Sequence, residues 1–389
     1  MRTQVAIVGA GPAGLLLSQL LHQEGIESVI LESRSREHVE GRIRAGVLEH
    51  GTARTLEEAG VGDRMKREGI VHEGMELRFA GEGHRIPLTD LTGKTITVYG
   101  QQEVVKDLIA ARLDQGGEIW FDTPVVGLEG LTTDRPRVLY EHDGEVQALE
   151  CAIVAGCDGY HGVARAAVPI EARTEHERAY SVGWLGIVAE VPPSTDELIY
   201  AYHDRGFALH SLRSPTRSRL YIQCDANDDV RRWSDRDIWD ELHARLAAPG
   251  WSLQEGPIVE RSIAPLRSFV MEPMRYGRLL LAGDAAHIVP PTGAKGLNLA
   301  VADVRLLHRA LSDWFQHGSE RGLDEYSPRC LDRVWRVQHF SWLMTQMLHR
   351  FPEEDAVAHP LRLAQLRQTV ESTSAAASLA EGYVGLPMP

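Results

Sequence analysis

Residues 4–33, "QVAIVGAGPAGLLLSQLLHQEGIESVILES", constrain the fold of this chain more than any other stretch. An apolar run, a glycine-rich turn, an amphipathic run with helical spacing and a second apolar run follow in that order, which predicts strand, turn, helix and strand. Gly9, Gly11 and Gly14 fit the G-x-G-x-x-G pattern of dinucleotide-binding βαβ units. Glu32 lies 18 positions after Gly14, where a carboxylate can accept hydrogen bonds from a ribose. We therefore predict a unit that binds a dinucleotide, without knowing which one.

Two later stretches also have an apolar run, typical of a buried strand, that is followed closely by an aspartate. In residues 153–168, "IVAGCDGYHGVARAAV", an apolar run ends at Asp158. Residues 283–300, "GDAAHIVPPTGAKGLNLA", follow another apolar run, contain Asp284 and lead into a segment with helical spacing. The doubled proline fixes backbone angles, and the glycines permit close approach. We expect this loop to meet a ligand, although an ordinary connection between a strand and a helix would have the same order.

Charge and cysteine usage narrow the function classes. The 389 residues carry a formal charge of −14 at pH 7, which argues against a general binder of nucleic acid or anionic membrane. An anionic ligand must therefore meet locally placed arginines. The four cysteines have no C-x-x-C spacing, the N-terminus has no signal-peptide pattern and no apolar run has membrane-spanning length. We expect a reduced, cytoplasmic protein without a metal site.

The three strand ends together resemble the single-component, FAD-dependent aromatic hydroxylases. The segments "GRIRAGVLEHG", "TVYGQ", "RGFAL", "IAPLRSFV" and "YVGLP" resemble members that act on 4-hydroxybenzoate, nearly from end to end. The resemblance implies hydroxylation at the 3-position to 3,4-dihydroxybenzoate, in the catabolism of aromatic compounds. It also implies FAD as cofactor, NADH or NADPH as reductant, O2 as co-substrate, a flavin C4a-hydroperoxide as the hydroxylating species, and a homodimer.

The resemblance further implies which residues contact the flavin cofactor. Asp284 would lie near the ribityl and phosphate groups, and Leu297 and Asn298 beside the isoalloxazine ring. Arg219 matches an arginine that biases movement of that ring between a buried and an exposed position. The full predicted set is Gly9, Gly11, Ala13, Gly14, Glu32, Arg42, Arg44, Ala45, Gly46, Val47, Gln101, Asp158, Asp284, Leu297 and Asn298.

Residues 198–224 alternate as strands joined by a turn at Ser214-Pro215-Thr216 would. Ser211 and Arg213 are two positions apart and are expected to share a face, as are Arg219 and Tyr221. Hydroxyls and a guanidinium on one face could bind a carboxylate, although solvated surface pairs have the same spacing. The resemblance assigns the serine, the first arginine and the tyrosine to the substrate carboxylate.

The resemblance also implies a proton relay from the substrate phenol. Tyr200 matches the tyrosine that contacts the phenolic oxygen, Tyr383 the next member, and His72 the outer end. Pro291 matches a position whose backbone carbonyl lies near the phenol, and Thr292 lines the same site. Taken alone, a buried tyrosine or histidine more often satisfies one structural hydrogen bond.

The segment after the first motif departs from the pattern of NADPH-using relatives. Those relatives have an arginine directly after the motif glutamate and a tyrosine at the position of His38. Here Ser33 follows the glutamate, and Arg34 is displaced by one position. Because bidentate recognition of a phosphate depends on direction, we expect NADH to be used at least as well as NADPH. His161 and Arg267 complete the predicted nicotinamide-nucleotide residues.

We predict a mixed α/β fold in which a Rossmann-like FAD-binding domain is interleaved with a β-sheet substrate domain and followed by a helical part. The predicted parts are residues 1–70, 98–180 and 268–323 for FAD, 71–97 and 181–267 for substrate, and 324–389 for the helical, interface-forming part. In the last part Trp335, Phe340, Trp342, Met344 and Met347 suggest a buried or dimer-facing surface.

Three alternatives stay open at this point. A nicotinamide dehydrogenase would use only the first motif, and an FAD sensor would not need the arginine and tyrosine residues assigned to substrate. Within the resembling family, another para-substituted benzoate such as 4-aminobenzoate could be the substrate.

Overall fold

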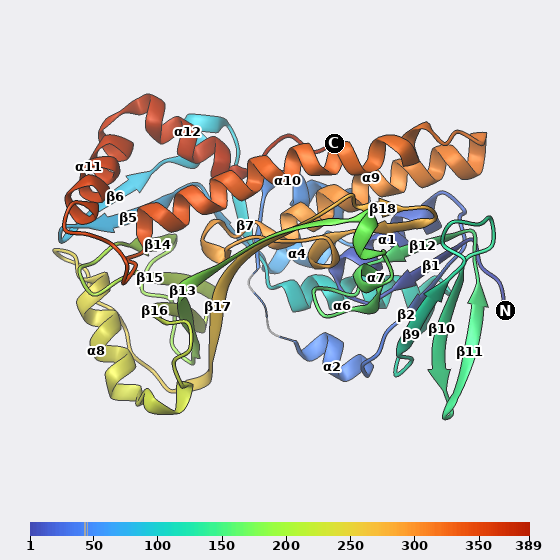
Figure 1. Ribbon diagram of the computed structural model, residues 1–389. Helices are drawn as coiled ribbons and strands as arrows, with labels where there is room; N and C mark the ends of the chain where they lie inside the picture. Colours follow the sequence, from blue (N-terminus) through green and yellow to red (C-terminus); the bar gives the residue numbers. More distant parts are fainter. Residues whose placement is uncertain (43, 45) are drawn as a thin grey trace.

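The computed structural model describes residues 1–42, 44 and 46–389, and its first strand lies within a six-stranded sheet (Figure 1). In spatial order the strands are β18 (Arg275–Tyr276), β19 (Leu279–Leu281), β12 (Ile153–Gly156), β1 (Val5–Val8), β2 (Ser28–Leu31) and β8 (Glu118–Trp120). Neighbours from β19 to β8 are parallel, and β18 is antiparallel to β19. The sheet thus combines segments that are far apart in the sequence, and the predicted mixed, interleaved fold class is confirmed.

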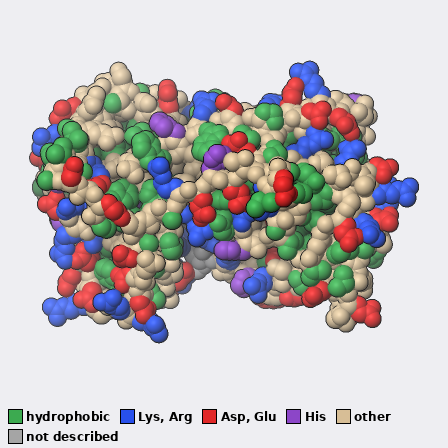
Figure 2. Space-filling model, viewed as in Figure 1, with side chains coloured by type: hydrophobic (Ala, Val, Ile, Leu, Met, Phe, Trp, Pro, Cys, Tyr) green, Lys and Arg blue, Asp and Glu red, His purple; other side chains and the backbone are tan. Residues whose placement is uncertain are grey.

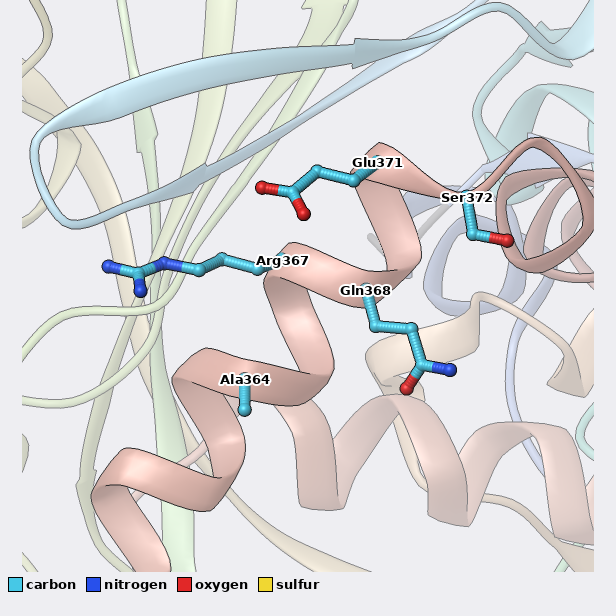
Figure 3. A pocket seen from close by; sticks show the side chains of 5 residues that line it. All are labelled: Ala364, Arg367, Gln368, Glu371 and Ser372. Carbon is cyan, nitrogen blue, oxygen red and sulfur yellow. The ribbon is translucent and has the colours of Figure 1, made fainter.

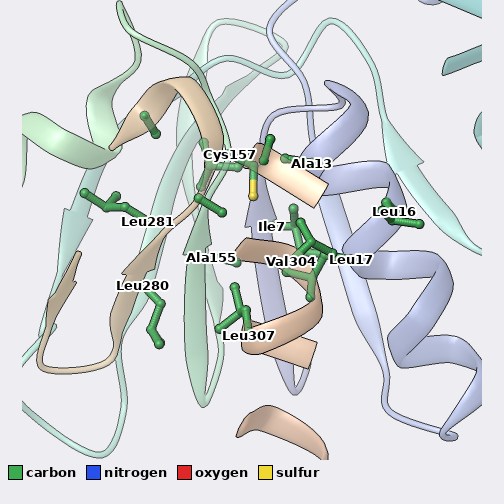
Figure 4. Packing of buried hydrophobic residues seen from close by; sticks show 14 of the residues in the cluster. Ile7, Ala13, Leu16, Leu17, Ala155, Cys157, Leu280, Leu281, Val304 and Leu307 are labelled. Atoms are coloured by element: carbon green, nitrogen blue, oxygen red, sulfur yellow. The ribbon is translucent and has the colours of Figure 1, made fainter. Parts of the chain in front are cut away.

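Helices α1 (Pro12–Gln23) and α9 (Gly296–His317) pack with this sheet. Figure 4 shows Ile7 and Ala155 of the sheet beside Leu17 of α1 and Val304 of α9, all in one buried cluster. Every residue of β1, β12 and β19 is buried, which explains why these strands are continuous apolar runs rather than alternating ones.

A second sheet has eight strands and belongs to the other lobe of Figure 1. In spatial order they are β20 (His287–Ile288), β17 (Ile258–Glu272), β13 (Thr174–Ala189), β16 (Arg217–Asp225), β15 (Ala208–Ser214), β14 (Leu198–Ala201), β5 (Met75–Phe79) and β6 (Glu82–Ile86). All neighbours are antiparallel except β14 and β5. Residues 198–224 contain three strands, and the turn predicted at residues 214–216 lies between β15 and β16.

Two long strands of this sheet, β13 and β17, extend between the lobes (Figure 1). The predicted domain boundaries at 180/181 and 267/268 fall inside them. Each of these strands therefore contributes residues to both predicted domains. The predicted domain boundaries are not tested by the structure and stay a prediction.

Smaller sheets and further helices complete the fold. Two three-stranded sheets contain β11 (Glu145–Glu150), β10 (Arg137–His142) and β9 (Val125–Glu129), and β3 (Val47–Leu48), β7 (Ile96–Val98) and β4 (Ile70–His72). The N-terminal and middle helices are α2 (Arg36–Gly41), α3 (His50–Glu58), α4 (Asp63–Glu68), α5 (Leu88–Thr92), α6 (Gln101–Asp114), α7 (Val163–Ala166) and α8 (Asp235–Leu246). The short 3-10 turns are η1 (Ile170–Ala172), η2 (Val230–Arg232), η3 (Gly283–Ala285) and η4 (Pro291–Gly293).

The C-terminal part is helical, with α10 (Arg321–Leu348), α11 (Ala358–Glu371) and α12 (Thr373–Val384). In α10 the two methionines named above are buried, whereas Trp335 and Trp342 remain partly exposed. Within the described ranges, no helix has the length and hydropathy needed to cross a membrane. On the face shown in Figure 2, acidic and basic side chains are interspersed.

The glycine turn after β1 depends on contacts that leave no room for a side chain. A Cβ at Gly14 would lie 2.1 Å from the backbone oxygen of Gly9, whereas a Cβ at Gly11 would have its nearest neighbour at 4.0 Å. Gly9 itself has a positive φ of 103°, which an L side chain rarely adopts.

We predict that Gly14→Ala lowers the free energy of unfolding by about 1–3 kcal/mol, because the clash is with backbone that cannot rotate away. Gly11→Ala is the matched control and should leave the apoprotein within about 0.5 kcal/mol of wild type. Urea denaturation of the apoproteins, followed by circular dichroism, measures both. Equal stability of the two variants would contradict this account of the turn.

Candidate active site

The carboxyl ends of four neighbouring parallel strands meet at one edge of the six-stranded sheet. In spatial order, Asp284 follows β19, Asp158 follows β12, Gly9 follows β1 and Glu32 follows β2. Ligands of open α/β sheets bind at such an edge. Three stretches that the sequence marks as strand ends therefore lie side by side.

Glu32 is bound to the glycine turn. Its Oε2 accepts a hydrogen bond from the backbone N of Ala10 at 2.8 Å, and its Oε1 accepts one from the backbone N of Arg34 at 2.9 Å. The carboxylate is therefore oriented before any ribose binds, and it retains lone pairs that face away from these two donors.

Asp158 is half-buried at the end of β12. Its Oδ2 accepts a hydrogen bond from the backbone N of Ala164 at 2.8 Å, at the start of α7. Its Oδ1 is buried and has no hydrogen-bond partner among the described residues. Burial raises the pKa of this carboxyl group, while the backbone donors oppose that shift.

Asp284 is exposed at the other end of the edge, in η3. Desolvation by the surrounding protein raises its pKa, and the positive charges of His287, Arg44 and Arg42 oppose the shift. The pKa of Arg44 is lowered by desolvation and by the neighbouring charge of Arg42. The loop is fixed from behind by Asp303, whose Oδ2 binds the ring of His287 at 2.6 Å. The two arginines are far from Asp284 in the sequence, yet they lie close enough in space for their charges to lower its pKa.

The segment around Arg44 continues into β3. A Cβ at Gly46 would lie 2.2 Å from the backbone oxygen of Tyr99, so the chain can pass here only as glycine. Val47 begins β3, and Gln101 is the first residue of α6. Ala45, also predicted to contact the flavin, lies outside the described residues.

The loop before α9 presents Pro291 to solvent and buries Thr292. The hydroxyl of Thr292 is 2.9 Å from that of Thr345 in α10. Ala294 adopts φ 54° and ψ 40°, a left-handed conformation that is unusual outside glycine. Its backbone N donates to the carbonyl of Pro291 at 2.9 Å. That carbonyl, predicted to lie near the phenol, therefore already accepts one hydrogen bond.

The side chain of Asn298 is already occupied. Its Oδ1 accepts from the backbone N of Glu49, and its Nδ2 donates to the carbonyls of Val47 and Ala294, at distances of 2.8–3.0 Å. The amide thus joins α9 to β3. Both N–H donors of this amide are thus used, while its oxygen can accept one more hydrogen bond. Leu297 beside it is half-buried.

The predicted substrate residues lie on adjacent strands of the eight-stranded sheet. Tyr200 of β14 is paired with Leu209 of β15, which is paired with Tyr221 of β16. Ser211 is paired with Arg219 in the same way. Because directly paired residues share a face, these side chains project from one side of the sheet.

Two hydrogen bonds define the ends of this face. The hydroxyls of Tyr200 and Tyr383 are 2.7 Å apart, and both rings are buried. Burial raises the pKa of each tyrosine, so both stay neutral and can donate as well as accept. At the other end, Nε of Arg219 donates to the hydroxyl of Tyr221 at 2.6 Å. The Nη1 atom of Arg219 is buried without a partner among the described residues.

His72 is buried in β4, and both of its ring nitrogens lack a partner among the described residues. Burial lowers its pKa to about 4, so the ring is neutral near pH 7. No hydrogen bond among these residues joins it to the tyrosine pair, and its place in a relay stays a prediction.

Comparison with known proteins identifies the family. The FAD binding domain family model matches residues 2–341. The chain is 51% identical over 389 residues to the p-hydroxybenzoate hydroxylase of Acinetobacter baylyi, covering 100% of this chain and 96% of that protein. The chain belongs to the p-hydroxybenzoate hydroxylase family. A likeness in fold extends to the p-nitrophenol 4-monooxygenase of Pseudomonas putida, with a TM-score of 0.84, 19% identity and 97% of each chain covered.

Membership of the hydroxylase family makes the protein a flavin-dependent enzyme with FAD as cofactor, and excludes the dehydrogenase and sensor alternatives. The strand-end edge fits this cofactor. The open space at Gly11 lets a pyrophosphate approach the N-terminus of α1. Glu32, the buried free oxygen of Asp158 and the exposed Asp284 supply acceptors along the same edge.

The predicted nicotinamide-nucleotide residues of this hydroxylase form two groups. His161 and Arg267 both contact the ring of Tyr160, with ring centroids 5.0 Å apart for the histidine and the guanidinium carbon 4.7 Å from the ring. Ser33, Arg34 and His38 instead lie just after Glu32, where His38 is in the first turn of α2. No contact among the described residues joins the two groups, so their common role stays a prediction.

A buried ion pair beside Tyr383 was not predicted from the sequence. Nζ of Lys295 is 2.7 Å from Oε1 of Glu49 and donates to the carbonyl of Tyr383 at 2.8 Å. All three residues are buried. The nearest sequence signal was a lysine inside the glycine-rich loop, but its acidic partner is 246 positions away.

Two hollows on the surface differ in their relation to the site. A hollow of about 640 Å³ between α10 and α12 is lined in part by Lys295 and Glu49. Another of about 430 Å³ (Figure 3) is lined only by side chains of α11 and the residue after it, namely Ala364, Arg367, Gln368, Glu371 and Ser372. The predicted site residues lie elsewhere, and we assign no role to this second hollow.

We predict that the stability of the protein falls as the pH decreases from about 6.5 to about 4. In this window the unfolded chain protonates His72, whose ordinary pKa is about 6.5, while the folded protein does not. The contribution of this one residue is of the order of 3 kcal/mol. His210 and His349 are buried with pKa values of about 4 and about 3, and act in the same direction.

His72→Gln should therefore flatten the decrease in stability below pH 6.5, measured by urea denaturation at a series of pH values. His142→Gln, at an exposed position of β10, is the control and should keep the wild-type profile. An unchanged profile for His72→Gln would contradict a neutral, buried imidazole at this position.

Proposed function

We propose that the protein converts 4-hydroxybenzoate to 3,4-dihydroxybenzoate, with NADH or NADPH and O2 as co-substrates. The observation that carries this proposal is the 51% identity, over the full chain, to a p-hydroxybenzoate hydroxylase. The site geometry supports it, since one face of the sheet has cationic groups at one end and a pair of tyrosine hydroxyls at the other. When bound, FAD supplies the redox chemistry, namely acceptance of a hydride and activation of O2.

Arg213, Ser211 and Tyr221 would bind the carboxylate. Neither Arg213 nor Arg219 forms an ion pair with an acidic residue in the part of the chain that the structure describes. Desolvation lowers the pKa of Arg213, and the charge of Arg219 lowers it further. A bound carboxylate would relieve this repulsion, so the site favours an anionic ligand.

The phenol end would use the two tyrosines. Because both hydroxyls are neutral and hydrogen-bonded to each other, Tyr200 would accept the phenolic proton while passing its own to Tyr383. Tyr383 would in turn release its proton toward the outer end of the relay, for which His72 is the predicted acceptor. An electron-rich phenolate is the more reactive partner for hydroxylation. The apolar, buried surroundings exclude water from the ring.

Product analysis after turnover tests the function directly. The purified holoenzyme is incubated with 4-hydroxybenzoate, 4-aminobenzoate and benzoate, and the products are identified by mass spectrometry. Formation of 3,4-dihydroxybenzoate at the highest kcat/KM supports the proposal. A higher kcat/KM for 4-aminobenzoate would show that 4-hydroxybenzoate is not the preferred substrate.

The protein would act as a homodimer in catabolism of aromatic compounds. The partly exposed tryptophans of α10 support a pairing surface there, since apolar aromatic side chains are enriched in such interfaces.

We predict that Arg213→Ala weakens binding of 4-hydroxybenzoate by at least about a hundredfold, because the carboxylate loses its main cationic partner. Arg217→Ala is the control, since that arginine is on the same hairpin but pairs with Glu190 at the surface. Titration of substrate, followed by the flavin absorbance, measures both. Near-normal affinity in Arg213→Ala would refute the carboxylate assignment.

We predict that Tyr200→Phe retains reduction of the flavin by NADH or NADPH but releases more hydrogen peroxide per nucleotide consumed. The missing hydroxyl would no longer take the phenolic proton, whereas hydride transfer does not require it. Tyr202→Phe is the control, because its hydroxyl binds His359 at 2.7 Å rather than Tyr383. Tight coupling in Tyr200→Phe would contradict the relay.

We predict that NADH is used at least as well as NADPH. Arg36 in the segment after Glu32 forms an ion pair with Glu40 at 2.6 Å, and Glu37 beside it adds negative charge that would repel a 2′-phosphate. Steady-state kinetics with both nucleotides at saturating 4-hydroxybenzoate provides the measurement. A kcat/KM at least tenfold higher for NADPH, roughly 1.4 kcal/mol, would overturn this prediction.

A further inference from the structure

Arg213 lies at an irregularity of the sheet. The register between β15 and β16 shifts after Leu212, which is paired with Ser218, so that Ser214 is paired with Arg217. Arg213 is thus the unpaired residue of a bulge, and bulges redirect side chains. Its Nη1 donates to the carbonyl of Arg44 at 3.0 Å, and its Nη2 donates to Oε1 of Gln102.

We propose that Gln102 is a positioning residue that orients the Arg213 guanidinium toward the substrate carboxylate. The inference rests on the proposed function, because it requires that Arg213 binds that carboxylate. Gln102 is the second residue of α6 and was not among the residues predicted from the sequence.

The amide of Gln102 has one orientation that satisfies its neighbours. Its Nε2 donates to Oε1 of Glu103 at 3.3 Å, so its oxygen faces the guanidinium. Glu103 is itself held by Arg64 at 2.6 Å and by Lys106 at 3.1 Å. A flipped amide would place its NH2 group against Arg213 and its oxygen against a carboxylate, and both contacts would be repulsive.

The packing around Gln102 leaves little freedom. A Cβ at Gly100, directly before α6, would lie 2.9 Å from the Gln102 amide and 3.0 Å from the guanidinium carbon of Arg213. The absence of a side chain at Gly100 therefore allows the helix start and the bulged strand to come together. The contact between Gln102 and Arg213 depends on this close approach.

A neutral acceptor suits this position. Arginine has five N–H donors in a rigid plane, and the contacts to Gln102 and the Arg44 carbonyl use one donor on each terminal nitrogen. The remaining donors stay available for a carboxylate. Because glutamine has no charge, it fixes the direction of the guanidinium without cancelling the positive charge that the substrate needs.

The experiment uses the holoenzyme with Gln102→Met, which keeps the length of the side chain but removes the acceptor, and Gln102→Glu, which keeps the acceptor but adds a negative charge. Both variants should raise the Kd for 4-hydroxybenzoate by about tenfold, with a smaller change in kcat at saturation. The Kd for the neutral analogue 4-hydroxybenzamide should change less than twofold. Asp114→Ala, at an exposed position of the same helix, is the matched control for each measurement.

A double-mutant cycle separates the inference from the proposed function. Gln102→Met should add less than twofold to the loss caused by Arg213→Ala, because Gln102 acts through that arginine. Normal affinity in Arg213→Ala would overturn the proposed carboxylate site itself. If Arg213→Ala weakens binding but both Gln102 variants bind 4-hydroxybenzoate normally, or if the losses multiply in the double variant, the inference alone is overturned. Equal losses for 4-hydroxybenzoate and 4-hydroxybenzamide would also overturn it.

Discussion

A buried ion pair connects the three stretches of chain that form the candidate site. Lys295 belongs to the loop before α9, Glu49 follows β3, and Tyr383 lies in the last turn of α12. Nζ of Lys295 is within hydrogen-bond distance of both the Glu49 carboxylate and the Tyr383 carbonyl. A buried charge is tolerated only with a close partner, and removing one member of such a pair typically costs several kcal/mol. The loop, the β3 segment and Tyr383 are therefore held in a fixed arrangement. The Asn298 amide, which bridges the same loop and strand, adds a neutral second connection.

The sequence predicted the fold class and a dinucleotide site from local patterns, and it predicted FAD from the resemblance to a known family. The apolar run, the glycine turn and the acid at the end of the next strand lie within thirty residues, and parallel packing brings Asp158 and Asp284 to the same edge. The family and the FAD cofactor were predicted correctly. The roles of individual residues, including Tyr200, Arg213 and His72, stay predictions.

What the sequence could not predict depends on contacts between distant segments. Nothing local marks Glu49 as the partner of Lys295, and a glutamine at the start of a helix has no special signal. The contact between Gln102 and Arg213 forms at a bulge in the strand, which the sequence does not indicate. The spacing of Ser211 and Arg213 predicts two residues on one face of a regular strand, whereas the register shift makes Arg213 the unpaired residue of a bulge. Similarly, no local pattern indicates that the side chain of Asn298, a residue predicted to lie beside the flavin ring, links α9 to β3.

The long strands β13 and β17 have a mechanical consequence. Each belongs to the substrate-side sheet along one part of its length and reaches the cofactor-side lobe with the other (Figure 1). Their ladder of backbone hydrogen bonds runs from Thr174 to Ala189 with one interruption near Val182 and one at its end. A hinge between the lobes would have to bend two paired strands at once, which is stiffer than bending a single linker. The two lobes are thus expected to unfold as one cooperative unit, so that a substitution that destabilises one lobe also destabilises the other.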